Sequence, residues 1–280
     1  SVPLSLLFGP DGLRHRLEDS GASAVVAHGP SLPALREVEG DLGALDTVLA
    51  VGDVPTEGGE IAFGRAVDDH PVHFETATTA AGAPALINYT SGTTGPPKGV
   101  VHAHRGLLGI LPAFASLGNM AIRPDDVVRI TVEWSWVGSL NNGVLTSLYY
   151  GVPLVADANS QFDPEGEFDL IDRFDVTILA PGPATGYRMM MQVDEPTARY
   201  DLASLRVALQ GGEALGQTIV DWFEETIGDV TVHEAYGQTE APAFVGDCSA
   251  LGVDHEPGYM GKALVGHEVT VLDPDEPRPV

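Results

Sequence analysis

The chain has 280 residues, 44% of them hydrophobic, and its 40 acidic and 14 basic residues give a formal net charge of −26. That length can bury the core of one large domain or two, and no apolar run is long enough to cross a bilayer. A surface this acidic repels nucleic acid and anionic membranes, so we expect neither as a partner. A single cysteine, Cys248, excludes an internal disulfide framework and favours a reducing, cytoplasmic location.

The basic residues are also unusual in kind, since only Lys98 and Lys262 are lysines. This composition is typical of a soluble acidic enzyme. It also fits adaptation to high cytoplasmic salt, where acidic, lysine-poor surfaces stay hydrated while salt screens their repulsion. The start of the sequence has no basic segment before an apolar stretch, so we expect no signal peptide.

Helical and extended patterns alternate along the chain, which is typical of an α/β protein with βα units around mostly parallel sheets. We expect two subregions, about 1–82 and 83–280, because residues 52–82 form a loop-rich connection. The predicted helices cover 10–20, 31–39, 105–118, 139–150, 164–174, 184–192 and 216–227. The predicted strands cover 24–27, 47–51, 83–88, 127–132, 152–156, 176–180, 205–210 and 267–273, and another begins at 230.

Two of these regions carry large apolar side chains that bear on the core and on a ligand site. The helix over 105–118 is expected to turn Leu107, Leu108, Leu111 and Phe114 inward. Trp134 and Trp136 follow a strand and precede a helix, which is where α/β folds place ligands. Core packing and substrate contact both remain open for these two tryptophans.

One stretch, residues 89–100 (YTSGTTGPPKGV), concentrates four serine and threonine hydroxyls, three glycines and one lysine. Glycines let a backbone approach a ligand closely, hydroxyls add donors, and a lysine adds a positive charge, so the stretch is suited to a polyphosphate. It is not a Walker A loop, because Lys98 precedes Gly99 rather than Ser or Thr. The candidate phosphate-binding residues are Thr90, Ser91, Gly92, Thr93, Thr94, Gly95 and Lys98.

A second stretch, residues 230–240 (VTVHEAYGQTE), is a strand that ends in a polar and acidic cluster. Tyr236 can stack on a base, Thr239 can bind a phosphate oxygen, and Glu240 can hold Mg²⁺ through its carboxylate. Between the two stretches, the strand over 205–210 runs into a glycine turn at Gly211 and Gly212.

The first stretch closely resembles the phosphate-binding signature of the adenylate-forming synthetases, which include acyl-CoA synthetases, luciferases and peptide-synthetase adenylation domains. The second resembles the next signature of that superfamily in the expected order, and residues 257–263 (PGYMGKA) resemble a third, weaker one. The similarity is nearest to acyl-CoA synthetases of the acetate to medium-chain group. It implies the large N-terminal domain of such an enzyme, cut at both ends, with the small C-terminal domain absent.

The resemblance implies ATP-dependent activation of a carboxylic acid to an acyl-adenylate and then to acyl-CoA, with ATP, Mg²⁺ and coenzyme A as the small molecules. By resemblance, Lys98, Thr239 and Glu240 are catalytic, with Glu240 on the metal. The implied nucleotide contacts add Gly212, Glu213, Ala214, Glu234, Ala235, Tyr236, Gly237 and Gln238 to the phosphate-binding residues. Trp134, Trp136 and Gly237 line the implied acid pocket.

Gly237 also bears on the length of the acid. Acetate-specific relatives carry a tryptophan at the matching position, and a glycine leaves room for more methylenes, each stabilising by about 0.8 kcal/mol when buried. We therefore expect an acid longer than acetate, from propionate to medium-chain fatty acids. Two alternatives stay open: an enzyme that adenylates an aryl acid or loads a carrier protein, and a nucleotide-binding fragment without turnover.

Overall fold

The computed structural model describes residues 1–55, 58–91, 95–120, 122–157, 161–276 and 279. The chain divides into two compact units, Ser1–His104 and Arg105–Val280, and each is described by itself. The division falls after the hairpin that carries the phosphate-binding stretch, whereas composition had placed the boundary before it, at 82/83. No helix in the described ranges is long and apolar enough to span a membrane.

The N-terminal unit contains a parallel three-stranded sheet in the order β1-β2-β3 and a separate antiparallel hairpin, β4-β5. The sheet packs against α1 and α2 through one apolar cluster that includes Leu13, Leu17, Leu35 and Val38. The predicted helix α1 ends where expected, with Gly21 in the left-handed conformation at φ 61°. In chain order the elements are α1 (Pro10–Ser20), β1 (Ala24–His28), η1 (Gly29–Ser31), α2 (Leu32–Arg36), η2 (Glu39–Asp41), β2 (Thr47–Val51), β3 (Ile61–Ala62), α3 (Phe63–Asp68), β4 (Pro84–Thr90) and β5 (Lys98–Ala103).

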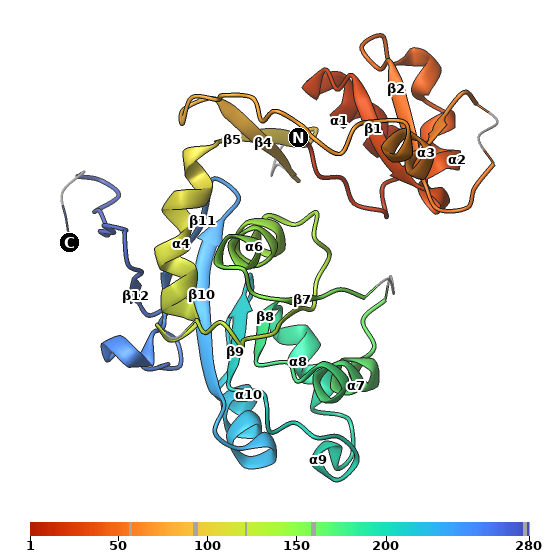
Figure 1. Cartoon of the computed structure of the whole chain (residues 1–280). Coiled ribbons are helices and arrows are strands. Elements are labelled where there is room, and N and C mark those ends of the chain that lie inside the picture. Colours follow the sequence, from red (N-terminus) through yellow and green to blue (C-terminus); the bar gives the residue numbers. More distant parts are fainter. Residues whose placement is uncertain (56–57, 92–94, 121, 158–160, 277–278, 280) are drawn as a thin grey trace. The chain divides into compact units, whose positions relative to one another are not determined.

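The C-terminal unit is built on a seven-stranded sheet in the order β12-β11-β10-β9-β8-β6-β7. Strands β7, β6, β8, β9 and β10 run parallel, and β11 and β12 join antiparallel at one edge. Its elements are α4 (Arg105–Leu117), β6 (Val128–Ile130), α5 (Val137–Ser139), η3 (Leu140–Leu145), α6 (Thr146–Tyr150), β7 (Leu154–Val155), α7 (Pro164–Phe174), β8 (Ile178–Gly182), α8 (Ala184–Met190), α9 (Pro196–Arg199), β9 (Val207–Gly211), α10 (Gln217–Trp222), η4 (Phe223–Ile227), β10 (Thr231–Gln238), β11 (Ala241–Gly246), η5 (Ser249–Leu251) and β12 (Lys262–Ala263) (Figure 1).

Both faces of this sheet are buried. Successive strand residues point to opposite sides, and the residues on each side pack into a different apolar cluster. Val207 and Leu209 of β9 join α4 and η3 in one apolar cluster. Ala208, between them, joins the other cluster, which α7, α8 and α10 cover. Continuous apolar strands such as β8 and β9 are therefore the natural sequence for this layer, and the prediction of a mostly parallel α/β sheet is confirmed.

Two buried ion pairs tie the sheet to its surroundings. Arg129 on β6 donates through Nε and Nη2 to Glu167 on α7, at 2.8 and 2.5 Å, and both side chains are over 90% buried. Arg206, just before β9, donates to Asp126 at 2.6 Å. Asp126 also accepts a hydrogen bond from Thr177, so its carboxylate joins the segments that enter β6, β8 and β9.

Two local predictions were wrong. Leu108 of α4 is 57% exposed, and Ile110 is buried instead, because the buried stripe of this helix starts one turn later than the sequence suggested. The predicted strand over 267–273 is reduced to one bridge between Leu272 and Pro279, since no neighbouring strand offers it a continuous partner in the described residues. The described part of segment 52–82 is mostly irregular, as expected, although it also contains β3 and α3.

Candidate active site

A cavity of about 300 Å³ opens in the C-terminal unit beyond the carboxyl ends of β6, β9 and β10. This edge of a mostly parallel sheet is the usual place for a ligand, because the loops that leave the strands meet there. Most of the wall is apolar, with a few polar side chains. The lining residues are Phe114, Leu117, Trp136, Val137, Gly138, Asn142, Leu209, Gln210, Gly211, Gly212, Ala235, Gly237, Gln238, Thr239, Pro242 and Ala243.

Trp136 forms one wall of the cavity and depends on two glycines for its position. A Cβ at Gly138 would lie 2.5 Å from the indole ring, so only glycine lets the ring settle against the backbone there. A Cβ at Gly212 would touch the same ring at 3.6 Å, and Gly212 has φ 92°. The turn after β9 and the start of α5 therefore meet at one aromatic side chain. Trp134 is 36% exposed and is not among the residues that line this cavity.

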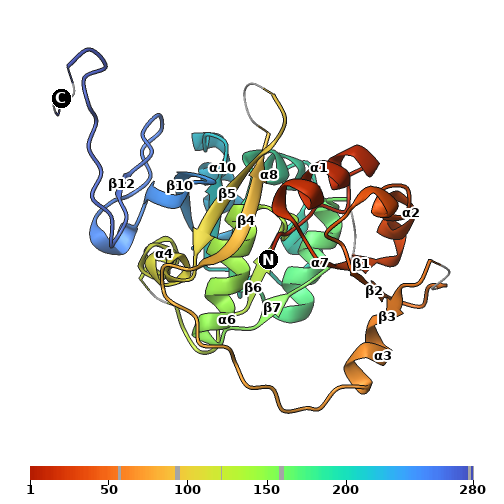
Figure 2. The ribbon, with the colours of Figure 1, turned by 90° about the horizontal axis from the view of Figure 1, so that it is seen from above.

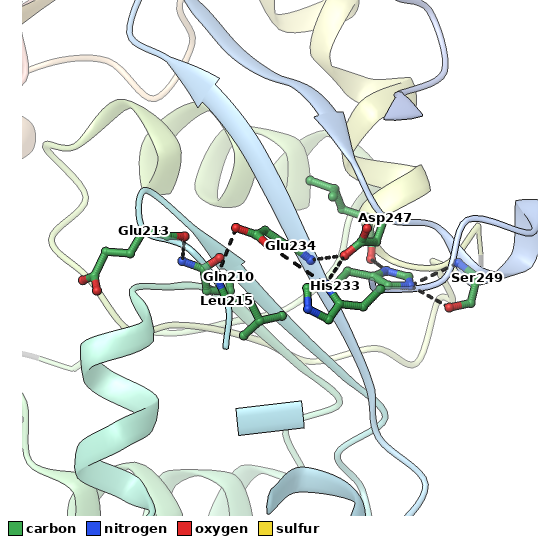
Figure 3. A network of polar contacts seen from close by, with 9 residues as sticks. Gln210, Glu213, Leu215, His233, Glu234, Asp247 and Ser249 are labelled. Atoms are coloured by element: carbon green, nitrogen blue, oxygen red, sulfur yellow. Dashed lines mark hydrogen bonds and ion pairs between the residues drawn. The ribbon is translucent and has the colours of Figure 1, made fainter. Parts of the chain in front are cut away.

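The turn over 211–215 is held from below by two side chains of adjacent strands. Gln210 and Glu234 are paired across β9 and β10, so both point to the same face of the sheet. The Gln210 amide donates from Nε2 to the carbonyl of Glu213, and Glu234 accepts at Oε1 from the Leu215 N–H at 3.1 Å (Figure 3). These side chains lie on the face opposite to Leu209, which faces the cluster around α4. They fix the turn from within the sheet; Gln210 also belongs to the cavity lining, whereas Glu234 does not.

Glu234 is itself supported by Asp247 and His255. Asp247 is fully buried and accepts at Oδ2 from the Glu234 N–H at 2.9 Å and from His255 Nδ1 at 3.0 Å. His255 Nδ1 also lies 4.0 Å from the second carboxylate oxygen of Glu234. Burial raises the pKa of Glu234, although the Leu215 N–H opposes this shift. A histidine therefore stands between two buried carboxylates directly beneath the turn.

The buried His233 lies on the opposite face of β10 and carries its proton on Nδ1. The N–H of Ser249 donates to Nε2 at 3.2 Å, which requires a lone pair on that nitrogen. Nδ1 therefore donates to the carbonyl of Leu117, at 2.8 Å. Burial lowers the pKa of His233, so the neutral ring is favoured. His233 thus links the end of α4 to the segment after β11 as a structural residue, as Figure 3 shows for its contact with Ser249.

Glu234→Gln should raise the free energy of unfolding at neutral pH, and the gain should disappear in acid. The amide keeps an oxygen for the Leu215 N–H but removes the buried charge. A carboxyl whose folded pKa is raised above its ordinary value of 4.5 loses stability as the pH rises through the folded pKa. Below 4.5 both states bind the proton and the difference vanishes. Urea unfolding at several pH values measures this, and a gain independent of pH would contradict it.

The phosphate-binding stretch lies in the N-terminal unit, on the hairpin β4-β5, whose strands Figure 2 shows side by side. Thr90 pairs with Lys98 at the open end, and both Ser91 and Lys98 are exposed. Two contacts fasten the hairpin to α1. Tyr89 donates to Asp19 at 2.7 Å, and His15 donates from Nε2 to the carbonyl of Pro97 at 2.8 Å.

The tyrosine contact has an electrostatic signature. Burial, followed by the hydrogen bond to Asp19, raises the pKa of Tyr89 to about 12. The phenol therefore stays protonated at neutral pH and continues to donate. Tyr89 of β4 and Pro97 before β5 are thus anchored to α1, while Ser91 and Lys98 remain exposed. Gly95 has φ 87°, a conformation that favours glycine. The predicted Gly92, Thr93 and Thr94 lie outside the described residues.

The structure brings six predicted residues together around the cavity and leaves others outside its wall. The six are Trp136, Gly212, Ala235, Gly237, Gln238 and Thr239. Tyr236 is 42% exposed and packs edge-on against Phe244, with ring centroids 5.4 Å apart. Glu213 is exposed and its carboxylate accepts from Thr185 at 3.0 Å. Ala214 is exposed in the turn, and Glu234 lies beneath it.

Sequence reasoning missed the residues that complete the wall. Phe114 was expected only to fill the core, Leu117 was not singled out, and Asn142 lies within a predicted helix without any motif. Pro242 and Ala243 belong to β11, a strand that was not predicted. The signal for β11 is weak because only six residues follow the predicted cluster before the chain turns.

Glu240 does not by itself define a metal centre. It is exposed in the turn between β10 and β11, and in the part of the chain that the structure describes no three His, Cys, Asp or Glu side chains are grouped to hold a metal ion. Mg²⁺ is commonly bound by one or two carboxylates together with substrate phosphates, and an exposed single carboxylate fits that mode. Its role as a Mg²⁺ ligand remains a prediction.

A sheet buried on both faces, with a cavity at the carboxyl ends of its strands, defines a ligand-binding α/β domain. The chain belongs to the AMP-binding enzyme family, which matches residues 1–280. It is 29% identical to an uncharacterized acyl-CoA ligase, YtcI, of Bacillus subtilis, over 98% of this chain and 50% of that protein. It is also 29% identical to the acetyl-coenzyme A synthetase of the same organism, over 97% of this chain and 46% of the relative.

Solved structures give the same fold. An anthranilate CoA ligase, AuaEII, in complex with anthranoyl-AMP matches with a TM-score of 0.88 and 25% identity, covering 100% of this chain and 52% of its own. An acyl-CoA synthetase of Brucella canis matches with a TM-score of 0.86 and 29% identity, covering 99% and 49%. The chain spans about half the length of the relatives it matches. The prediction of an N-terminal domain of an adenylate-forming enzyme is thereby confirmed.

Proposed function

We propose that this chain supplies the nucleotide and acid sites of an AMP-forming acid–thiol ligase. The observation that carries the proposal is the cavity at the carboxyl edge of the sheet, where the second signature meets the glycine turn and Trp136. Membership of the AMP-binding family supports it, as does the similarity to acyl-CoA ligases. The substrates would be ATP, a carboxylic acid and coenzyme A.

In the proposed first step, a carboxylate oxygen of the acid attacks the α-phosphorus of ATP. The bond from that phosphorus to the bridging oxygen of the β-phosphate breaks, giving an acyl-adenylate and pyrophosphate. In the second step the thiol sulfur of coenzyme A attacks the acyl carbon, AMP leaves with the bonding electron pair, and the thiol proton passes to solvent. Such steps depend on positioning and charge stabilisation rather than on a protein nucleophile.

Different residues would bind the phosphates, the adenine, the metal ion and the acid. The hydroxyls of Thr90 and Ser91 and the ammonium of Lys98 would hold the β- and γ-phosphates, together with the loop between them. Thr239, in the cavity wall, would meet the α-phosphate or the acid carboxylate, and the turn over 211–215 would border the adenine. Glu240 would hold Mg²⁺, which supplies charge neutralisation when bound. The apolar wall formed by Phe114, Leu117 and neighbouring residues would take the organic part of the acid.

Carboxylate-dependent ATP–pyrophosphate exchange tests the proposal. The panel is acetate, butyrate, octanoate, benzoate and anthranilate, since an aryl acid is favoured by the match to the anthranilate CoA ligase. Exchange with one acid establishes adenylation and names the substrate class. A protein that binds ATP but exchanges with no acid, here and in its full-length parent, would favour a nucleotide-binding role without turnover. Salt adaptation is tested separately, by measuring the free energy of unfolding as the KCl concentration rises. A curve that is flat or falling with KCl would contradict it.

Lys98→Ala should weaken ATP binding about 10- to 100-fold while leaving AMP binding unchanged. A charged hydrogen bond to a phosphate is lost, and AMP lacks the β- and γ-phosphates that this residue would hold. Isothermal titration with both nucleotides measures the effect. Lys262→Ala is a matched control, since it removes the only other lysine, an exposed residue of β12. Equal loss of ATP and AMP affinity would indicate a general defect in place of a phosphate contact.

A further inference from the structure

One polar side chain in the cavity wall has no role in the proposed chemistry. Asn142 lines the cavity, and its Oδ1 is buried without a hydrogen-bond partner among the described residues. Buried amide oxygens are nearly always paired, and leaving one unpaired lowers stability. The lining of the cavity is mostly apolar and includes Phe114, Leu117 and Val137. An amide in this position lowers the stability of the fold unless a ligand donates a hydrogen bond to it.

The position of Asn142 in the fold places it at the acid end of the cavity. It lies in η3, a π-helical segment that continues α5, and it follows Gly138 by four residues, so the two share a face of the helix. The helix starts beyond the carboxyl end of β6 and runs back along the sheet. Asn142 is therefore roughly 6 Å further along the helix axis than Gly138, away from the turn over 211–215. Single π-helical turns frequently occur at functional sites.

Other unpaired groups in the cavity region do not offer the same contact. Gln210 also lines the cavity and its Oε1 is unpaired, but its amide nitrogen is engaged by the Glu213 carbonyl, so this side chain belongs to the turn over 211–215. Asn141, Ser139 and Ser147 have unpaired oxygens in the same helical region, yet none of them lines the cavity. Asn142 therefore offers an unpaired amide oxygen on the helical wall of the cavity, apart from the turn that Gln210 supports.

We propose that Asn142 determines substrate specificity by hydrogen-bonding a hydroxyl or amino group on the organic part of the acid. This inference rests on the proposed function, since it concerns the acid that the adenylation site would take. The substrate class is then a hydroxy- or amino-substituted carboxylic acid in place of an unsubstituted fatty acid. A site built to pair with a hydroxyl discriminates strongly against an analogue that lacks it, because the amide is then left without a partner.

The test is equilibrium binding of acyl-sulfamoyl adenosines, stable analogues of the acyl-adenylate, to the 280-residue chain. Each analogue with a hydroxyl at carbon 2, 3 or 4 of a pentanoyl group is compared with one that has a methyl group at that carbon, so that shape is matched. We expect one hydroxyl isomer to bind about tenfold or more tightly than its methyl partner. If all methyl analogues bind as tightly as the hydroxyl ones, the inference is wrong while the proposed function stands. If no analogue binds, the proposed function fails first.

Variants locate the effect on Asn142. Asn142→Leu should remove the hydroxyl preference by weakening the hydroxyl analogue and strengthening the methyl one. Asn141→Leu is the control, since it removes a neighbouring buried amide outside the cavity, and it should keep the preference. Thermal unfolding of each variant checks the fold, and the comparison of analogues on the unaltered chain does not depend on any variant. A preference that survives Asn142→Leu would overturn the assignment.

Discussion

Glu167→Ala should lower the free energy of unfolding of the C-terminal unit by about 3–5 kcal/mol. The substitution leaves the Arg129 guanidinium buried without its carboxylate partner, and an uncompensated charge in a protein interior is strongly destabilising. The effect can be followed in this unit alone. All three tryptophans, Trp134, Trp136 and Trp222, belong to it, so their fluorescence during denaturation with urea reports its unfolding.

The chain offers a matched control for this experiment. Arg199 and Glu165 also form a two-contact pair, at 3.0 and 2.6 Å, but both side chains are about half exposed. Glu165→Ala should therefore lower the free energy of unfolding much less than Glu167→Ala does, because solvent screens an exposed pair. The double variant Glu167→Leu and Arg129→Leu should recover most of the loss, since it removes both buried charges. If Glu167→Ala and Glu165→Ala lower the free energy of unfolding equally, burial does not determine how much stability is lost when the carboxylate is removed.

Gly237→Ala should destabilise the C-terminal unit by about 3 kcal/mol and abolish binding of acyl-adenylate analogues. A Cβ at this position would lie 2.2 Å from the backbone nitrogen of Ala243 and 3.0 Å from the carbonyl of Ala241. Backbone cannot move aside as a side chain can, so the hairpin β10-β11 must shift. Both strands of that hairpin line the cavity, which couples the fold to the site.

Urea unfolding and analogue binding measure the two effects of Gly237→Ala. Gly109→Ala makes the same chemical change inside α4, where a Cβ meets nothing within 4 Å. It should raise stability by about 0.5–1 kcal/mol, because alanine favours helix over glycine. The opposite signs of two identical substitutions separate the steric clash from any general effect of losing a glycine. A neutral Gly237→Ala would show that the hairpin adapts freely.

Gly237 also illustrates how far the sequence reaches. The family resemblance suggested that a glycine here leaves space for a longer acid, which remains a prediction. The structure adds that any side chain must first displace the neighbouring backbone, and this depends on β11, whose pairing no local pattern announced. A larger residue at 237 therefore changes the geometry of the wall as well as its volume.

The long elements were predictable because local patterns specify them. The helix over 164–174 has Asp163 at its N-cap, accepting from the Glu165 N–H, and an initial proline, and its bounds match the prediction. The support beneath the turn over 211–215 was not predictable in the same way. Gln210 and Glu234 are separated by two dozen residues, and only the register of β9 against β10 makes them neighbours. Asp247 and His255 join them through a strand and loop that the sequence did not reveal.

The irregular pairing within the hairpin β10-β11 has a consequence for how acid preference could diverge among related proteins. Its register shifts between Tyr236 and Gln238, and Ala243 across from it has φ 48°, a left-handed conformation unusual for alanine. Successive side chains of a strand face opposite sides, so adding or removing one residue at such a bulge shifts the register and turns cavity-facing side chains of that strand to the other side. Insertion or deletion of one residue in this hairpin could thus change which side chains line the cavity in a single evolutionary event, with no substitution among the lining residues.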